Sequence, residues 1–432
     1  MTRVKESAWA SMQKGGLVKG RLKMGGHFTA VDLFCGAGGL TLGFKSAEVE
    51  GFGFKIVAAL DSWKWAAETY KANHPEVEVV QGDIRDEAVR ERLCKAAGGH
   101  VDLVIGGPPC EAFSLAGKRD PNDPRARLFY EYVKVVRALR PYACVMENVK
   151  GILTMVALRE DLPEEEKSQA LAAMNELLDL GSVGKARRAA PQYLLRGNAI
   201  KDPKLMPKLE FVRRRITTAS EAVGQALGRE GYEVAWRLLN AADYGVPQER
   251  RRVFFIGARS GLRIPIRFPE PTHAKSPRVD VSGRRLERWR TLRDAIGDLP
   301  PLEEREGDEV YEGGFSSIFM SRNRVMDWGR PSYTILASAR HVLLHPDSPP
   351  MVKLGRDERA FAEGGRSRRL SIRECARVQT FPDWYKFIGG TVVDKYALVG
   401  DAVPPLLARR VAEEVLRSLL EAGLKPSARE GR

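Results

Sequence analysis

The stretch Phe28–Ala47, FTAVDLFCGAGGLTLGFKSA, contains the pattern that decides the fold. Its first part, FTAVDLF (28–34), is short and mostly apolar, which predicts a buried strand. The second part, CGAGGLTLGFKSA (35–47), predicts a glycine-rich turn that opens a helix. A strand, a glycine turn and a helix in this order are typical of an α/β domain with parallel strands.

The same alternation continues outward from this stretch for the first half of the chain. Further strands are expected at 54–60, 77–83, 100–107, 143–149, 232–240 and 251–258, and helices at 66–72 and 127–139. From about residue 259 this rhythm is lost in a segment rich in Pro, Gly and Arg. We therefore expect an α/β fold with a doubly wound mixed sheet and a second, smaller, loop-rich domain.

This pattern divides the chain into four parts. A basic N-terminal tail precedes the main domain, and a C-terminal segment with a strand–turn–helix pattern rejoins its sheet. A helical and basic insertion interrupts the main domain at about 158–230. The expected boundaries are 1–27 for the tail, 28–258 for the main domain, 259–390 for the loop-rich domain and 391–432 for the C-terminal segment.

The charge of the chain favours a polyanionic partner. There are 70 Lys and Arg against 56 Asp and Glu, which gives a formal net charge of +14 and a pI of about 9.6. Nucleic acid is the first candidate for such a partner. Residues 185–215 alone carry ten basic residues against Asp202 and Glu210. This segment is interpreted either as a solvated face or as a surface that contacts phosphates.

Cysteine usage and hydropathy restrict the compartment. The five cysteines are an odd number and are widely spread without a CxxC pair, so we expect neither a disulfide framework nor a metal site. No apolar run approaches the roughly 20 residues that span a bilayer, and the N-terminus lacks the apolar core of a secretory signal. We expect a cytoplasmic, nucleoid-associated protein with no membrane partner.

Three successive strand ends carry groups that suit a nucleoside cofactor. Gly36, Gly38 and Gly39 let a ligand approach the backbone where the first strand meets its helix. Asp61 ends the next strand and could hold ribose hydroxyls, and Asp83 follows the third and could accept a bond from an exocyclic amine. Each residue taken alone is more often a cap or turn residue in a site without a ligand.

Three further motifs carry potential chemistry. Cys110 follows the rigid turn GGPP (106–109), which makes it a candidate nucleophile, although a lone Cys is usually a small buried hydrophobe. Glu147 ends the next strand and would lie beside Cys110, or it merely caps a turn. In QERRRV (248–253), Arg250 and Arg252 alternate onto one face of a basic strand edge.

Taken together, these motifs resemble the C5-cytosine-specific DNA methyltransferases, and they occur in the usual order of that family. The match covers most of the chain. It runs through AVDLFCGAGG (30–39), Asp61, GDI (82–84), GGPPCEAFS (106–114), ENV (147–149), YGVPQERRRVFFIG (244–257), TLRDAIGDLP (291–300), RRLSIRECARVQTFPDWYKFIG (368–389) and VGDAVPP (399–405).

The resemblance implies a Rossmann-like methyltransferase fold with S-adenosyl-L-methionine as cofactor. The loop-rich segment would be a target recognition domain, whose DNA sequence cannot be read here. Asp401 stands where family members usually carry Asn, which leaves that single contact open. The cofactor-binding residues implied by the resemblance are Phe34, Gly36, Gly38, Gly39, Asp61, Ser62, Asp83, Ile84, Pro109, Leu128, Asp401 and Ala402.

The resemblance also implies a mechanism. The target cytosine is flipped out of duplex DNA, and Cys110 adds to its carbon 6. Glu147 holds the base, and Arg252 and Arg250 support it. The methyl group is then transferred to carbon 5. The DNA-binding residues implied by the same motifs are Ser114, Gln248 and Arg250.

The expected function is that of the modification enzyme of a type II restriction–modification system. We expect a monomer that acts on double-stranded DNA, with a cognate restriction endonuclease that uses the same site without a stable complex. One alternative is a tRNA cytosine-5 methyltransferase of the same fold, with which ENVKG (147–151) is shared. Another is a catalytically dead, cofactor-binding regulator, against which the intact Cys110, Glu147 and Arg252 argue.

Overall fold

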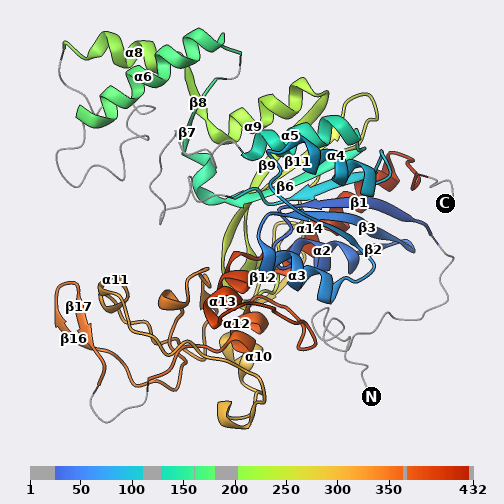
Figure 1. Cartoon of the computed structure of the whole chain (residues 1–432). Helices are drawn as coiled ribbons and strands as arrows, with labels where there is room; N and C mark the ends of the chain where they lie inside the picture. The colour runs from blue at the N-terminus through green and yellow to red at the C-terminus, as the bar shows by residue number, and fades with distance from the viewer. Residues whose placement is uncertain (1–24, 110–127, 160, 181–202, 363–366, 428–432) are drawn as a thin grey trace. The chain divides into compact units, whose positions relative to one another are not determined.

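The computed structural model describes residues 25–109, 128–159, 161–180, 203–362 and 367–427 (Figure 1). The chain forms two compact units. The first unit comprises residues 1–105, 239–251 and 267–432, and the second comprises 106–238 and 252–266. The boundaries expected for a separate loop-rich domain stay a prediction, because the unit that contains 267–432 also contains the first strands.

The first unit is built on parallel strands joined by helices, as the glycine-rich stretch predicts. Strand β1 pairs in parallel with β3, and β3 pairs in parallel with β4 and antiparallel with β2. Strand β5 lies on the other side of β1. The elements are β1 (His27–Leu33), α2 (Gly39–Lys45), β2 (Glu48–Val49), β3 (Phe52–Asp61), α3 (Lys64–Asn73), β4 (Glu78–Gln81), α4 (Glu87–Ala96) and β5 (Leu103–Gly106).

Burial explains why residues 28–33 form a strand. All six side chains are less than 9% exposed, including Thr29 and Asp32, so the strand lies inside the unit. The polar members are bonded: Thr29 donates from its backbone to Asp102 Oδ2 at 2.7 Å, and the Thr41 hydroxyl donates to Asp32 Oδ2 at 2.8 Å. Each of these hydrogen bonds offsets part of the cost of burying a polar group, although Asp32 Oδ1 has no hydrogen-bond partner among the described residues.

The C-terminal residues complete the first unit. Helix α14 (Pro405–Glu421) packs against α2. Gly43 makes the close approach possible, because a Cβ there would lie 2.4 Å from the Cβ of Ala408. Small residues at a helix contact let two backbones approach each other closely.

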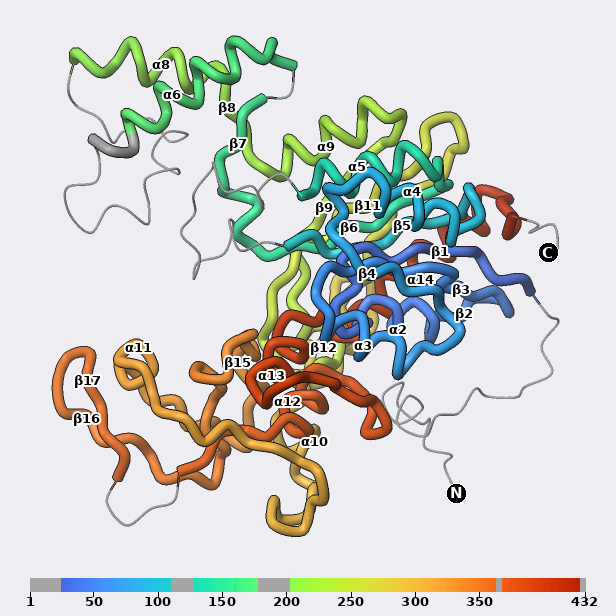
Figure 2. The backbone as a smooth tube through the Cα atoms, viewed as in Figure 1, coloured from blue at the N-terminus to red at the C-terminus, as the bar shows by residue number. Residues whose placement is uncertain are grey.

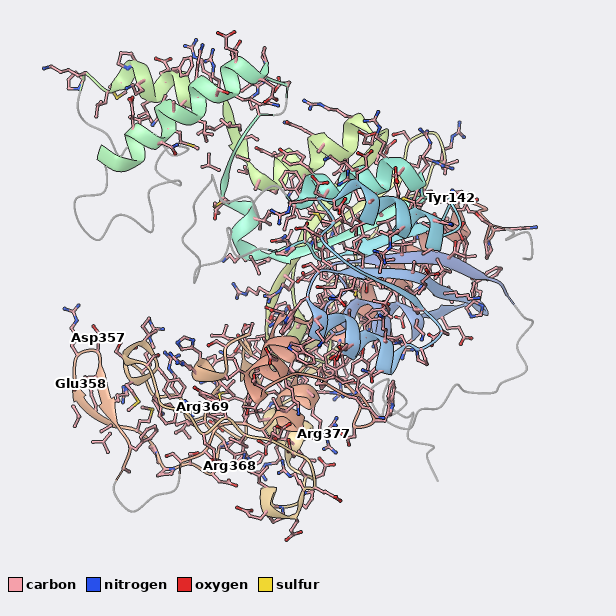
Figure 3. The ribbon with its side chains drawn as sticks, in the orientation of Figure 1. Tyr142, Asp357, Glu358, Arg368, Arg369 and Arg377 are labelled. Atoms are coloured by element: carbon pink, nitrogen blue, oxygen red, sulfur yellow. The ribbon has the colours of Figure 1, made fainter. Side chains whose placement is uncertain are left out.

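Residues 267–401 contain few regular elements, as their composition predicts. Three short helices share one core, in which Leu292, Val378 and Tyr396 are buried. Glu374 is fully buried and is bonded by Arg305 at 3.0 Å and by Arg368, which Figure 3 labels, at 2.8 Å. The helices are α10 (Leu292–Ile296), α12 (Ile372–Val378) and α13 (Val392–Asp401), and the short strands include β12 (His273–Ala274), β13 (Arg278–Val279) and β14 (Arg285–Arg288).

The second unit has an antiparallel strand pair at its centre. Strand β6 pairs antiparallel with β11, and β9 neighbours β11 on its other side. The expected α/β class with a mixed sheet is therefore confirmed, since parallel and antiparallel pairs both occur. The elements are α5 (Leu128–Leu139), β6 (Ala143–Val149), α9 (Ala219–Arg229), β9 (Tyr232–Asn240) and β11 (Arg251–Arg259).

The expected insertion has a small core of its own. Helices α6 (Glu164–Leu180) and α8 (Met206–Arg213) lie side by side in Figure 2 and are joined to the unit by the strand pair β7 (Val156–Leu158) and β8 (Ile216–Thr218). Met174, Leu209 and Val212 are buried between them. The insertion is thus a folded element, and its residues 181–202 lie outside the described part of the chain.

Candidate functional site

The turn after β1 is shaped for a ligand that approaches the backbone. Phe34, Gly36 and Gly38 all have positive φ angles, of 54°, 52° and 82°. A Cβ on Gly36 would meet nothing within 4 Å, so the space above this residue is open. Positive φ is easy for glycine and strained for phenylalanine, which indicates that the surrounding structure holds Phe34 in place. Gly39 then begins α2.

Asp61 joins the end of β3 to this turn. Its Oδ2 accepts from the backbone N–H of Gly36 at 2.9 Å, and its Oδ1 accepts from that of Trp63 at 2.8 Å. Burial raises the pKa of Asp61, whereas these backbone hydrogen bonds lower it. Ser62 is the next residue and is exposed. The structure thus brings the glycine turn and the acidic strand end together, as the sequence predicts.

Asp83 and Ile84 follow β4. Both carboxylate oxygens of Asp83 accept from Arg85, and the Nη2–Oδ2 distance is 2.5 Å. The hydrogen bond from Arg85 lowers the pKa of Asp83, so its carboxylate is an acceptor at neutral pH. Ile84 is 2% exposed and offers an apolar surface beside that acceptor.

Arg250 fixes the chain at residues 400–402. Its guanidinium donates to the carbonyl oxygens of Ile335 at 3.0 Å, Gly400 at 2.8 Å and Ala402 at 3.0 Å. The side chain is 1% exposed, and all three acceptors belong to the same unit. Asp401, which stands between the two carbonyl acceptors of this loop, is exposed. Arg250 therefore orders the backbone on which two of the expected cofactor contacts depend.

Gln248 belongs to the same buried network. Its Oε1 accepts from the backbone N–H of Ile335 at 3.0 Å, and its Nε2 donates to Gln379 Oε1 at 2.8 Å. Gln379 in turn donates to the carbonyl of Val399 at 2.7 Å. The DNA contacts expected for Gln248 and Arg250 stay predictions, and both side chains are engaged inside their own unit. Sequence reasoning missed Gln379 entirely.

Glu147 and Arg252 meet on the strand pair of the second unit. Arg252 pairs with Val149 and Phe254 with Glu147 in the antiparallel register, so the two side chains come from adjoining positions. Arg252 Nε lies 2.9 Å from Glu147 Oε1. Their side chains are 13% and 10% exposed, so the ion pair is largely shielded from water. A shielded pair is a stronger electrostatic element than a surface one.

The Gly-Gly-Pro-Pro turn reaches the same strand end. Asn148 donates from Nδ2 to the carbonyl of Pro108 at 3.1 Å. A Cβ on Gly107 would lie 3.3 Å from Glu147 Oε2, which is closer than side chains usually approach. The chain that leads to Cys110 is thus held against the Glu147 end of β6. Cys110 and Ser114 themselves lie outside the described residues, whereas Pro109 and Leu128 lie inside them and are partly or fully buried.

The described part of the chain offers neither a metal centre nor a membrane span. There, no group of three or more His, Cys, Asp and Glu side chains is placed as a metal ion requires. No helix among the described residues is both long and apolar enough to cross a membrane. Asp61 and Asp83 supply carboxylates that can accept hydrogen bonds from ribose hydroxyls or an amine. Glu147 and Arg252 form a carboxylate–guanidinium pair beside a turn that two prolines stiffen.

Comparison with known proteins gives consistent matches over most of the chain. The family model "C-5 cytosine-specific DNA methylase" matches residues 28–168 and 210–417. The unmatched residues between these ranges fall within the expected insertion. The type II methyltransferase M.FnuDI of Fusobacterium nucleatum is 34% identical over 409 residues, covering 90% of this chain and 95% of the relative. M.MthTI of Methanothermobacter thermautotrophicus is 35% identical over 402 residues, covering 89% and 96%.

Solved structures show the same fold at lower identity. The Entamoeba histolytica methyltransferase EhMeth matches with a TM-score of 0.53 and 12% identity, covering 91% of this chain and 99% of that one. The S. pombe Dnmt2 methyltransferase matches with a TM-score of 0.51 and 14% identity over the same shares. At such identities the comparison supports the fold alone.

Proposed function

Because this chain belongs to the C-5 cytosine-specific DNA methylase family, we propose that it transfers a methyl group from S-adenosyl-L-methionine to carbon 5 of cytosine in duplex DNA. The observation that carries the proposal is the shielded Glu147–Arg252 pair, at 2.9 Å, on the strand end that also holds the Gly-Gly-Pro-Pro turn. This arrangement provides the Glu147 carboxyl group and the Arg252 guanidinium group beside the place proposed for the cytosine ring.

The residues of the first unit fit the proposed cofactor. The open space above Gly36 admits a ligand against the backbone, and the glycines of the turn carry no Cβ that would block its approach. Asp61 would bind the ribose hydroxyls together with Ser62. The charged Asp83 would accept from the adenine amine, with Ile84 and Phe34 against the ring. When bound, the cofactor supplies an electrophilic methyl carbon.

The residues of the second unit would act on the base. The thiolate of Cys110 forms a bond to carbon 6 of the flipped cytosine, which makes carbon 5 nucleophilic. Glu147 would accept a hydrogen bond from the exocyclic amine and, as the carboxylic acid, would give its proton to N3, which neutralises the negative charge that the ring gains from the thiolate. Arg252 would orient Glu147 through their ion pair. After methylation at carbon 5, loss of the proton there expels the thiolate and releases 5-methylcytosine.

The biological setting is proposed from the relatives. M.FnuDI and M.MthTI are named type II methyltransferases and align over nearly their whole length. These names support a modification enzyme. We propose further that it works as a monomer in the cytoplasm, at the nucleoid. Its cognate restriction endonuclease would act on the same site without forming a stable complex with it.

A methyl-transfer assay tests the proposal. Purified protein with tritium-labelled S-adenosyl-L-methionine should label duplex DNA and leave tRNA unlabelled. Glu147→Gln should lower the rate by about 10²-fold or more, because glutamine has no acidic proton to give to N3 of the reacting ring. Glu233→Gln, on the exposed side of β9, is the matched control and should keep full activity. Label in tRNA alone, or in neither nucleic acid, would contradict the proposal.

A further inference from the structure

A concave site in the first unit is lined by none of the residues to which a catalytic, cofactor-binding or DNA-binding role was assigned above. It is a cavity of about 270 Å³ between the β12–β14 strands, the short helical turn η4 (Ala241–Tyr244) and helix α14. Arginines dominate its lining, with one histidine and one carboxylate. Those charged and titratable residues are Arg284, Arg285, Arg290, Arg410, His273 and Glu287.

Two of the four guanidinium groups that line the cavity have carboxylate partners, and two have none within ion-pair distance among the described residues. Arg284 is bonded to Asp280 at 3.2 Å, and Arg410 Nη1 to Glu413 at 3.1 Å. Within the described residues, the guanidinium groups of Arg285 and Arg290 have no hydrogen bond and no ion pair. The two guanidinium groups without a partner therefore share the cavity with one lining carboxylate, Glu287. Like charges gathered in this way repel one another unless an anion binds among them.

Buried donors point to the same conclusion. His273 is 7% exposed, and its Nδ1 lies 2.8 Å from the hydroxyl of Thr272. Its Nε2 lies 3.4 Å from Glu287 Oε2 but has no hydrogen-bond partner among the described residues, and neither has the buried Nε of Arg410. A buried polar group without a partner costs about 1–3 kcal/mol, so an acceptor that enters the cavity would relieve two such costs.

The electrostatics keep the histidine available as a hydrogen-bond donor rather than a cation. Burial lowers the pKa of His273, Glu287 raises it, and Arg290 and Arg410 lower it. Burial likewise lowers the pKa of Arg290, with Glu287 and Asp294 raising it and Arg410 lowering it. When Thr272 donates to Nδ1, Nε2 carries the proton and donates into the cavity.

We propose that this cavity binds a phosphoryl group. A guanidinium group can donate two parallel hydrogen bonds to two oxygens of one phosphoryl group. The neutral imidazole N–H of His273 and the buried Nε–H of Arg410 add two directed donors. The cavity is large enough for one phosphate and a few waters. The group would come from the DNA backbone or from a free phosphate ion, and both sources present the same oxygens.

Equilibrium dialysis of the full chain with ³²P-labelled inorganic phosphate, at constant ionic strength in chloride, tests the site. Wild-type protein should bind phosphate saturably. The double variant Arg285→Gln/Arg290→Gln should weaken that binding about tenfold or more, because it removes both guanidinium groups that have no ion-pair partner. Arg278→Gln, exposed on neighbouring β13 and outside the cavity lining, is the matched control and should bind as wild type. No saturable binding, or equal binding by the double variant, would overturn the proposal.

A second arm distinguishes the two sources. If the DNA backbone fills the cavity, unlabelled duplex should displace the labelled phosphate. The double variant should then bind DNA less tightly, with a salt slope lower by about one for each phosphate that it no longer binds. If a free ion fills it, the label should stay bound at saturating DNA, and the salt slope should not change. Because methyl transfer is not a readout, failure of the proposed function would leave this result interpretable.

Discussion

Arg250 and Arg252 are two residues apart, and their partners differ completely. Alternation along a strand predicts one shared face, but Arg250 falls between β10 (Gln248–Glu249) and β11, where the strand pattern is interrupted. Arg252 pairs with Glu147, and Arg250 donates to the carbonyls of residues 335, 400 and 402. The residue next to the proposed chemistry and the residue that orders the proposed cofactor loop are therefore different ones.

This difference makes a prediction for Arg250→Lys. Lysine keeps the charge but cannot reach three carbonyls with a planar fork, so residues 400–402 should be less ordered. We expect the KM for S-adenosyl-L-methionine to rise about tenfold, with a smaller change in kcat. Arg251→Lys, exposed and adjacent, is the control. Steady-state kinetics that show an unchanged KM in the folded Arg250→Lys protein would rule out this positioning role.

At the scale of elements, the contact between α2 and α14 depends on a glycine. A Cβ at Gly43 would lie 2.6 Å from the carbonyl oxygen of Pro405 as well as against Ala408. Gly43→Ala should therefore lower the free energy of unfolding by about 1–3 kcal/mol, since the backbone must shift. Gly228→Ala, in α9, meets nothing within 4 Å and should raise it by up to about 1 kcal/mol. Urea unfolding that ranks the two variants in the reverse order would refute this packing argument.

The contact of β1 with α2 includes a carboxyl group that folding keeps protonated. Burial raises the pKa of Asp32 to about 7, opposed by the Thr41 hydrogen bond and reinforced by Asp61. Above pH 3.8 the unfolded chain ionises this group while the folded chain keeps its proton. The free energy of unfolding should therefore fall as pH rises from about 4 to about 7, and level off above that.

Asp32→Asn isolates this effect, because the amide oxygen can still accept from Thr41 and does not titrate. Relative to this variant, the wild type should lose stability by up to about 4 kcal/mol between the two ends of that pH range. Denaturant unfolding of both proteins at several pH values provides the measurement. Curves that run parallel with pH would show that Asp32 is ionised in the folded chain.

At the scale of the whole molecule, the structure gives ion-pair partners to some of the cations in the basic segment 185–215. In its described part, Lys208 pairs with Glu176, Arg214 with Glu210 at 2.7 Å, and Arg215 with Glu166 at 3.0 Å. These cations bind within the insertion, and much of the charge that remains lies in residues 185–202, outside the described part.

Reversal of three of those charges tests whether the segment contacts DNA. Arg187→Glu, Arg188→Glu and Arg196→Glu together should weaken DNA binding and flatten its dependence on salt, because fewer counterions are released. The control reverses Lys71, Arg92 and Lys95, which are exposed on α3 and α4 and change the net charge equally. Fluorescence anisotropy titrations at several salt concentrations give both quantities. Equal effects of the two triple variants would mean that only net charge matters.

Local patterns predicted the strands, the glycine turn and the acidic strand ends, because each depends on neighbouring residues. The expected strand 28–34 is observed at His27–Leu33, and the expected helix 127–139 at Leu128–Leu139. The buried network of Gln248, Arg250 and Gln379 could not be predicted, since the partners of Gln248 and Arg250 lie 85 to 152 residues away along the chain. The arginine cavity was missed for the same reason, because α14 contributes Arg410 from the far end of the sequence.

The central claim is that Cys110 bonds covalently to the target cytosine, and one measurement tests it most directly. Duplex DNA with 5-fluorocytosine at the target position cannot lose a proton from carbon 5, so the adduct should persist after methyl transfer. Incubation with S-adenosyl-L-methionine, followed by proteolysis and mass spectrometry, should locate the crosslink on the peptide that contains Cys110. The Cys110→Ser protein should form none. A crosslink on another residue, or no crosslink with a protein that methylates ordinary cytosine, would contradict the mechanism.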